Sequence, residues 1–112
     1  MAIKNPKFHP MLNELVESIR AMYGSQLKRI ILYGSYASDE ATPDSDIDIL
    51  VVLDKQLKST YSEAGKLVPI EAELNLKYGV VPSCIPVSVL DYEKADTPFF
   101  KNVNREGVIL HG

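Results

Sequence analysis

The sequence contains little cysteine, no tryptophan and no long hydrophobic run. Cys84 is its single cysteine, which excludes an internal disulfide and a cysteine-based zinc site. No stretch reaches the roughly 20 apolar residues that a membrane-spanning helix needs. The first ten residues, MAIKNPKFHP, also lack the apolar core of a signal peptide. We therefore expect a cytoplasmic protein that does not cross a membrane.

An excess of positive charge is missing as well. Twelve Lys and Arg residues stand against fifteen Asp and Glu residues, which gives a formal net charge of -3. The chain therefore has no overall basic footprint for nucleic acid. Its length of 112 residues and its 46% hydrophobic content are typical of one globular domain, which we expect to span residues 1–112.

The first half of the chain predicts one helix and two buried strands. Apolar residues at helical spacing favour a helix over residues 10–22, which ends before Gly24. The runs LKRIILY (Leu27–Tyr33) and IDILVVL (Ile47–Leu53) are apolar enough to be central strands. The link between these strands is short, so we expect a mixed sheet flanked by helices, an α/β fold of the α+β type.

The next segment predicts a long helix. Thr60 and Glu63 form a capping-box pattern that opens a helix running to about Tyr78, with Gly79 just beyond its end. Pro69 lies inside this helix and has no N–H to donate, so we expect it to kink or split the helix.

The last part of the chain predicts three short elements. Residues 80–89 form a third strand, and two prolines in it favour an edge or bulged position. Cys84 in this strand is expected to be a small core residue. A short helix over residues 97–107 and an extended tail at residues 108–110 complete the predicted order.

One pair of residues at the end of the first strand is typical of an anion site. Gly34 and Ser35 close the strand and open a short predicted helix over residues 35–41. Glycine permits a tight turn and close backbone approach, and a helix start presents free N–H groups to an anion. The serine hydroxyl adds one more donor. The pair alone is a weak signal, because Gly-Ser occurs in many turns.

A second pair stands at the start of the next strand. Asp46 and Asp48 are two residues apart, so the pleat of a strand would place both carboxylates on one face. Two adjacent carboxylates repel each other unless a cation lies between them, and hard oxygen ligands suit Mg²⁺. A phosphate-binding turn beside a magnesium site predicts phosphoryl or nucleotidyl transfer. The alternative interpretation of Asp46 and Asp48 is a solvated strand end.

The combination of these motifs resembles a known family. Gly34-Ser35, ten residues, and then Asp46-x-Asp48 is similar to the signature of the DNA polymerase β-like nucleotidyltransferase superfamily. The resemblance implies the polymerase β-like nucleotidyltransferase fold, with ATP as substrate and Mg²⁺ as cofactor. It also implies that Gly34 and Ser35 contact the nucleotide phosphates. Asp46 and Asp48 would be the catalytic residues that hold the metal.

The length of the chain resembles the minimal nucleotidyltransferases of this superfamily, whose partners are all-helical HEPN proteins. The resemblance implies an antitoxin that transfers AMP from ATP to a protein hydroxyl, a tyrosine of a HEPN-type toxin. A chain this small exposes much sheet and helix surface, so we expect a homodimer or a complex with that partner.

The sequence departs from the family pattern in two places. Ser38-Asp39 stands where many members have Arg-Gly, and residues 80–90 contain no acidic residue where full active sites carry a third carboxylate. A second interpretation therefore stays open. In it, the chain is a catalytically degenerate module that neutralises a HEPN-like partner by contact or senses nucleotide.

Overall fold

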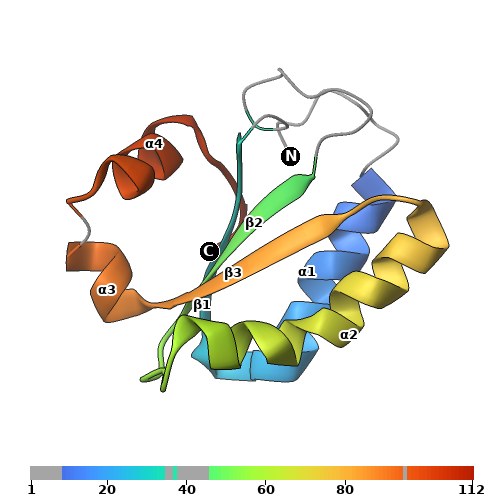
Figure 1. The fold of residues 1–112 in the computed structure, drawn as a ribbon, viewed down its shortest axis with the longest axis horizontal. Coiled ribbons are helices and arrows are strands. Elements are labelled where there is room, and N and C mark those ends of the chain that lie inside the picture. Colours follow the sequence, from blue (N-terminus) through green and yellow to red (C-terminus); the bar gives the residue numbers. More distant parts are fainter. Residues whose placement is uncertain (1–8, 35–36, 38–45, 95) are drawn as a thin grey trace.

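A central mixed sheet organises the protein (Figure 1). The computed structural model describes residues 9–34, 37, 46–94 and 96–112. Within these residues, four strands form one sheet in the order β3-β2-β1-β4. The strands are β1 (Leu27–Tyr33), β2 (Ile47–Leu53), β3 (Pro82–Ser88) and β4 (Val108–His111). β1 pairs antiparallel with β2 and with β4, whereas β2 and β3 run parallel, which confirms the predicted mixed sheet.

Helices cover both faces of this sheet (Figure 1). α1 (His9–Tyr23) and α2 (Thr60–Tyr78) pack on one face, and α3 (Val89–Lys94) and α4 (Pro98–Glu106) lie on the other. A three-residue 3₁₀ turn, Gly24–Gln26, joins α1 to β1. The parallel pairing of β2 and β3 requires a long crossover, and α2 supplies it.

The two central strands are buried on both sides, which explains their continuous apolar sequences. Alternate residues of β2 enter different cores. Ile47, Ile49 and Val51 face α1 and α2, while Leu50 and Val52 face α3 and α4. Side chains of a strand alternate between faces, so Asp48 belongs to the face that α3 and α4 cover. This alternation places the polar residue at the start of β2 on the same side of the sheet as α3 and α4.

The long helix begins and ends with side-chain and glycine caps. Ser59 is the N-cap residue, and its hydroxyl accepts a hydrogen bond of 3.0 Å from the Ser62 N–H. The predicted capping box at Thr60 is therefore wrong by one position. Gly79 ends the helix in the left-handed conformation at φ 68°, as predicted. Of the kink or split expected at Pro69, the split is wrong, because one helix runs from Thr60 to Tyr78 through this residue.

The edges of the sheet lie where the sequence placed them. β3 is an edge strand that carries both prolines, but it ends at Ser88, and residues 89–94 form α3 instead of continuing the strand. The predicted extended tail is β4, which pairs with β1 through Ile31 opposite Ile109 and Leu32 opposite Val108. No helix within the described residues has the length and apolar character needed to cross a membrane.

One carboxylate is buried under α1 and α2. Glu63 is 4% exposed, and its Oε2 accepts a hydrogen bond of 2.6 Å from the Tyr23 hydroxyl. Lys55 and Lys66 place their Nζ atoms 3.4 and 3.3 Å from Oε1. Burial raises the pKa of Glu63, but the hydrogen bonds from Tyr23 and the lysines outweigh it and lower the pKa overall. Glu63 therefore joins α2 to α1 as a charged group rather than capping its own helix.

Candidate active site

The candidate site lies at the corner of the sheet where β1 ends and β2 begins. Antiparallel pairing places Tyr33, the last residue of β1, opposite Asp48. Asp46 directly precedes β2, and Gly34 directly follows β1. Three of the four predicted site residues therefore meet at one corner. The fourth, Ser35, lies outside the described residues, as does most of the short helix expected over residues 35–41.

The two aspartates influence each other electrostatically. Asp48 is half-buried and Asp46 is exposed. Burial raises the pKa of Asp48, and the negative charge of Asp46 raises it further. Both causes disfavour the ionised form of Asp48, and a divalent cation would offset both. Carboxylate oxygens are ligands that Mg²⁺ prefers, so the pair fits such an ion.

Gly34 is in direct contact with one of these carboxylates. Its backbone has φ +78°, in the left-handed region that favours glycine, and a Cβ at this position would collide with Oδ2 of Asp48. The carbonyl of Gly34 accepts a hydrogen bond of 3.1 Å from the Ala37 N–H, which begins the turn after β1. Residue 34 must therefore be glycine both for its conformation and for its space.

A small pocket of about 220 Å³ adjoins this corner. Tyr33 and Gly34 line one side, and residues of α4, among them Phe99 and Asn102, line the other. The rings of Phe99 and Tyr33 meet edge to face at 5.4 Å between centroids. Burial raises the pKa of Tyr33 to about 12, with a further contribution from the charge of Asp48. No local pattern predicts that α4 lines this corner, because only the folded chain brings α4 onto β1.

No third acidic residue of the described chain joins the pair. Among the residues that the structure describes, no group of three or more His, Cys, Asp or Glu side chains could hold a metal ion. The β3 residue opposite Asp48 is Ser83. Glu71 of α2 instead accepts a hydrogen bond of 2.7 Å from the Cys84 N–H on β3. The site therefore offers two carboxylates for a metal, and a general base is not supplied by β3.

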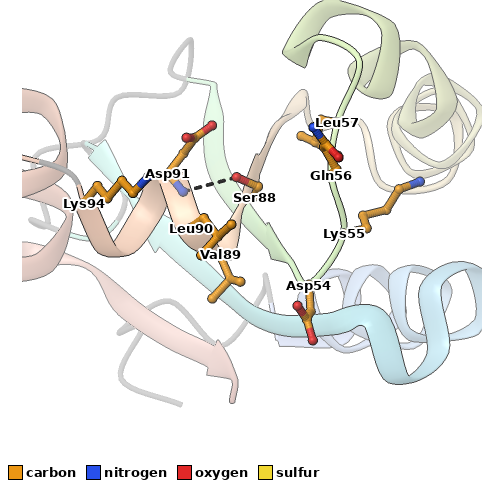
Figure 2. Close-up of a pocket in the computed structure, with 9 residues that line it drawn as sticks. All are labelled: Asp54, Lys55, Gln56, Leu57, Ser88, Val89, Leu90, Asp91 and Lys94. Atoms are coloured by element: carbon orange, nitrogen blue, oxygen red, sulfur yellow. Dashed lines mark hydrogen bonds between the residues drawn. The ribbon is translucent and has the colours of Figure 1, made fainter.

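The opposite end of the sheet carries a different hollow, of about 450 Å³ (Figure 2). It lies beyond the carboxyl ends of β2 and β3, and its lining includes Asp54, Lys55 and Asp91. Two of these charges are already paired: Asp54 lies 3.8 Å from Lys28, and Lys55 lies 3.4 Å from Glu63. The hollow is separate from the Asp46–Asp48 corner and offers matched carboxylates for control substitutions.

Comparisons with known proteins bear on the family and the fold of the chain. The sequence model of the nucleotidyltransferase domain matches residues 12–110. A protein of Methanocaldococcus jannaschii, named as a candidate protein adenylyltransferase, is 38% identical over 101 residues. That match covers 89% of this chain and 94% of the relative.

Solved structures share the fold at lower identity. One chain of a toxin–antitoxin crystal structure with AMP-PNP superposes with a TM-score of 0.61 at 22% identity, over 90% of this chain and 73% of that one. A candidate nucleotidyltransferase of Sulfolobus solfataricus superposes with a TM-score of 0.55 at 14% identity, over 97% of this chain and 90% of the other. The predicted fold class is confirmed.

Proposed function

The chain belongs to the nucleotidyltransferase domain family, and from this premise we propose that it transfers AMP from ATP to a hydroxyl group of a partner protein. The observation that carries the proposal is the contact of Gly34 with Asp48, beside Asp46, at one corner of the sheet. This corner combines a side-chain-free turn with two carboxylates that favour a cation. The M. jannaschii relative supports a protein as the acceptor.

We assign the metal to the two aspartates. Asp46 and Asp48 would hold Mg²⁺, which when bound stabilises the negative charge that develops on the departing pyrophosphate. A side chain at residue 34 would displace the Asp48 carboxylate, so glycine keeps that carboxylate directly beside the turn to which we assign the phosphates. The neighbouring Ser35 would donate its hydroxyl to the same phosphates.

The transfer itself exchanges one phosphorus–oxygen bond for another. The acceptor oxygen forms a bond to the α-phosphorus of ATP while the bond to the bridging oxygen breaks, and pyrophosphate leaves with that electron pair. Within the described residues β3 presents Ser83 rather than a carboxylate opposite Asp48, so we propose that the acceptor proton passes to solvent or to a group on the partner. This feature predicts slow turnover, since a general base typically contributes about 10²–10⁴-fold to a rate.

The acceptor we propose is a tyrosine of a HEPN-type toxin, with this chain as its cytoplasmic antitoxin. The structural likeness to a toxin–antitoxin complex that was crystallised with AMP-PNP supports a toxin partner and a nucleotide substrate. The resemblance of the chain's length to that of the minimal nucleotidyltransferases supports a HEPN-type toxin as this partner.

The proposal is tested by incubating the full chain with ATP labelled at the α-phosphate, Mg²⁺ and a HEPN-type partner protein. We expect label on the partner and a mass increase of one or more AMP units. ATP labelled at the γ-phosphate should leave no label, because that phosphate departs with pyrophosphate.

A contact-only antitoxin is the second candidate, favoured by the missing third carboxylate among the described residues. It predicts a partner that is neutralised without modification, and equally well by the Asp46→Asn variant. That result would overturn the transfer proposal.

Substitution of Gly34 tests the geometry of the corner. We expect Gly34→Ala to lower the free energy of unfolding by about 1–2 kcal/mol, the usual cost of a left-handed alanine. The new methyl group also displaces the Asp48 carboxylate, so the rise in melting temperature on adding Mg²⁺ and ATP should shrink or disappear. Circular dichroism melts with and without Mg²⁺ and ATP measure both effects.

Gly79 provides the matched control. It also has a positive φ, +68°, but nothing lies within 4 Å of a Cβ built there. Gly79→Ala should therefore carry the same backbone cost and keep the full response to Mg²⁺ and ATP. If Gly34→Ala keeps that response as well, the close contact with Asp48 does not matter for ligand binding.

A further inference from the structure

The outward face of α2 is apolar. Tyr61, Val68 and Leu76 are 91%, 53% and 87% exposed, and the exposed residues Gly65 and Ala72 lie between them. We call these five residues the outer stripe of α2. Their spacing of four, three, four and four positions places them along one side of a helix. A helix normally turns charged residues toward solvent, so this stripe needs a partner.

The outer stripe lies opposite the side of α2 that packs into the protein. Leu67 and Leu74 are buried on that inner side, against the core under α1 and the sheet. The Asp46–Asp48 corner belongs to the other face of the sheet, which α3 and α4 cover. The outer stripe is therefore separate from the candidate active site (Figure 1).

We propose that the outer stripe of α2 binds a second copy of this chain, with the two α2 helices packed antiparallel about a two-fold axis. The proposal is independent of the catalytic function. The reason is that large and small side chains follow one another along the stripe in the same order from either end. When the axis passes between Val68 and Pro69, Tyr61 of one copy lies opposite Leu76 of the other.

The inner positions of the stripe match in the same way. With the same axis, Gly65 of one copy lies opposite Ala72 of the other. Two small residues that face each other allow the helices to approach closely, and the larger side chains at both ends fill the space beside them. An isologous contact of this kind uses the same surface on both copies, as a two-fold dimer requires.

The charges beside the stripe are complementary in this arrangement. Lys66 and Glu73 lie on the same flank of α2, and antiparallel packing brings Lys66 of each copy near Glu73 of the other. In this arrangement Lys66 of one copy and Glu73 of the other are offset by two residues, which is about 3 Å along the helix axis. Within the described chain Glu73 forms no ion pair, and the Lys66 side chain is 57% exposed although it already reaches Glu63. Both charges can therefore reach across the interface.

The size of the interface predicts a reversible dimer. α2 has 19 residues and so spans about 28 Å. One such helix pair falls at the small end of specific interfaces, below about 1,200 Å² of total buried surface. We expect a dimer dissociation constant of about 10–100 µM, so the monomer should dominate in dilute solution.

Sedimentation of the full chain between about 5 and 500 µM tests this proposal. We expect a shift from monomer to dimer across the series. Leu76→Lys should weaken the dimer at least about 10-fold, because it places a charge opposite Tyr61. Leu90→Lys is the control, since Leu90 is 63% exposed on α3, away from α2, and should leave the dimer unchanged. A chain that stays monomeric throughout, or an equal effect of both variants, would overturn the proposal.

Disulfide trapping gives an independent test of the register. Val68 lies beside the proposed axis, so a cysteine at this position faces its own copy. Oxidation of Val68→Cys should yield a covalent dimer, while Leu90→Cys should stay monomeric under the same conditions. The native Cys84 is 5% exposed and adds little background. Failure of Val68→Cys to cross-link, or selective capture of the HEPN protein through position 68, would exclude the second copy as occupant.

Discussion

Replacing Asp48 with asparagine is expected to slow AMP transfer by at least about 100-fold without unfolding the protein. The substitution removes a carboxylate that we assign to Mg²⁺, and losing one preorganised electrostatic contact to a transition state typically costs about 10²–10³-fold. Single-turnover assays with labelled ATP and the proposed HEPN partner measure the rate. Asp91→Asn is the control, because Asp91 lies in the hollow at the other end of the sheet (Figure 2) and should leave the rate unchanged.

The same variant should lose transfer activity but not stability. Burial and the charge of Asp46 both disfavour ionised Asp48, so the neutral asparagine should leave the metal-free protein as stable as the wild type or more stable. The pKa of Asp48 is raised above its ordinary value of 3.8 in the folded state. The advantage of asparagine therefore begins as the pH rises above 3.8, is complete above the raised pKa, and vanishes in acid. Urea unfolding at several pH values shows whether a lower transfer rate comes from the missing carboxylate or from an unstable fold. A less stable Asp48→Asn variant at neutral pH would contradict the repulsion between the aspartates.

The second large effect concerns the buried carboxylate of Glu63. We expect Glu63→Ala to lower the free energy of unfolding by about 2–4 kcal/mol, because it leaves the Tyr23 hydroxyl without its acceptor and removes the anchor of two lysines. Glu17→Ala is the control: Glu17 pairs with Arg20 at the surface, where both side chains are more than half exposed. A surface pair of this kind contributes about 0–1 kcal/mol. Urea unfolding at neutral pH measures both variants.

The pH dependence of this contact follows from the lowered pKa of Glu63. The folded state holds the carboxylate ionised below its ordinary pKa of 4.5, so the contact stabilises the protein fully above that value. The stabilisation is lost as the pH falls through the lower, folded-state pKa. The difference between the wild type and Glu63→Gln should therefore be largest near neutral pH and smaller in acid. A difference that does not change with pH would show that Glu63 contributes by packing alone.

The sheet could be predicted from the sequence because its signals are local and strong. Leu27–Tyr33 and Ile47–Leu53 are strands with the predicted bounds, since apolar runs of this length between turns are typical of buried strands. The mixed pairing followed from the short link between them. Gly79 also ends its helix as predicted, because a left-handed residue after a helix is most often glycine.

Elements that depend on competition between neighbours were harder to predict. Ser59 and Thr60 are both residues that favour the N-cap position. The Glu63 carboxylate is buried against Tyr23, so it cannot also reach back to the helix start as a capping box at Thr60 requires. Ser59 is therefore the N-cap residue. Pro69 does not divide α2, which keeps Leu67 and Leu74 in one core on either side of it. Such outcomes depend on tertiary packing, which no local pattern contains.

The candidate site was predictable in its residues but not in its contacts. The spacing of Asp46 and Asp48 placed them at the start of a central strand, where the structure has them. The collision that excludes a side chain at Gly34 comes from pairing between strands that are thirteen or more residues apart in sequence. The pocket beside Tyr33 depends in the same way on α4, a helix from a distant part of the chain.

The position of α4 and β4 in the chain determines the order in which the protein can fold during synthesis. α1, α2 and the first three strands leave the ribosome before residues 98–111, so the core under α1 and α2 can close early. The opposite face of the sheet, with Ile31 and Leu50, is covered only in part, by α3, until α4 places Val103 on it. During that interval the nascent chain exposes both an apolar surface and the unpaired edge of β1, which are the features that chaperones bind and that drive aggregation.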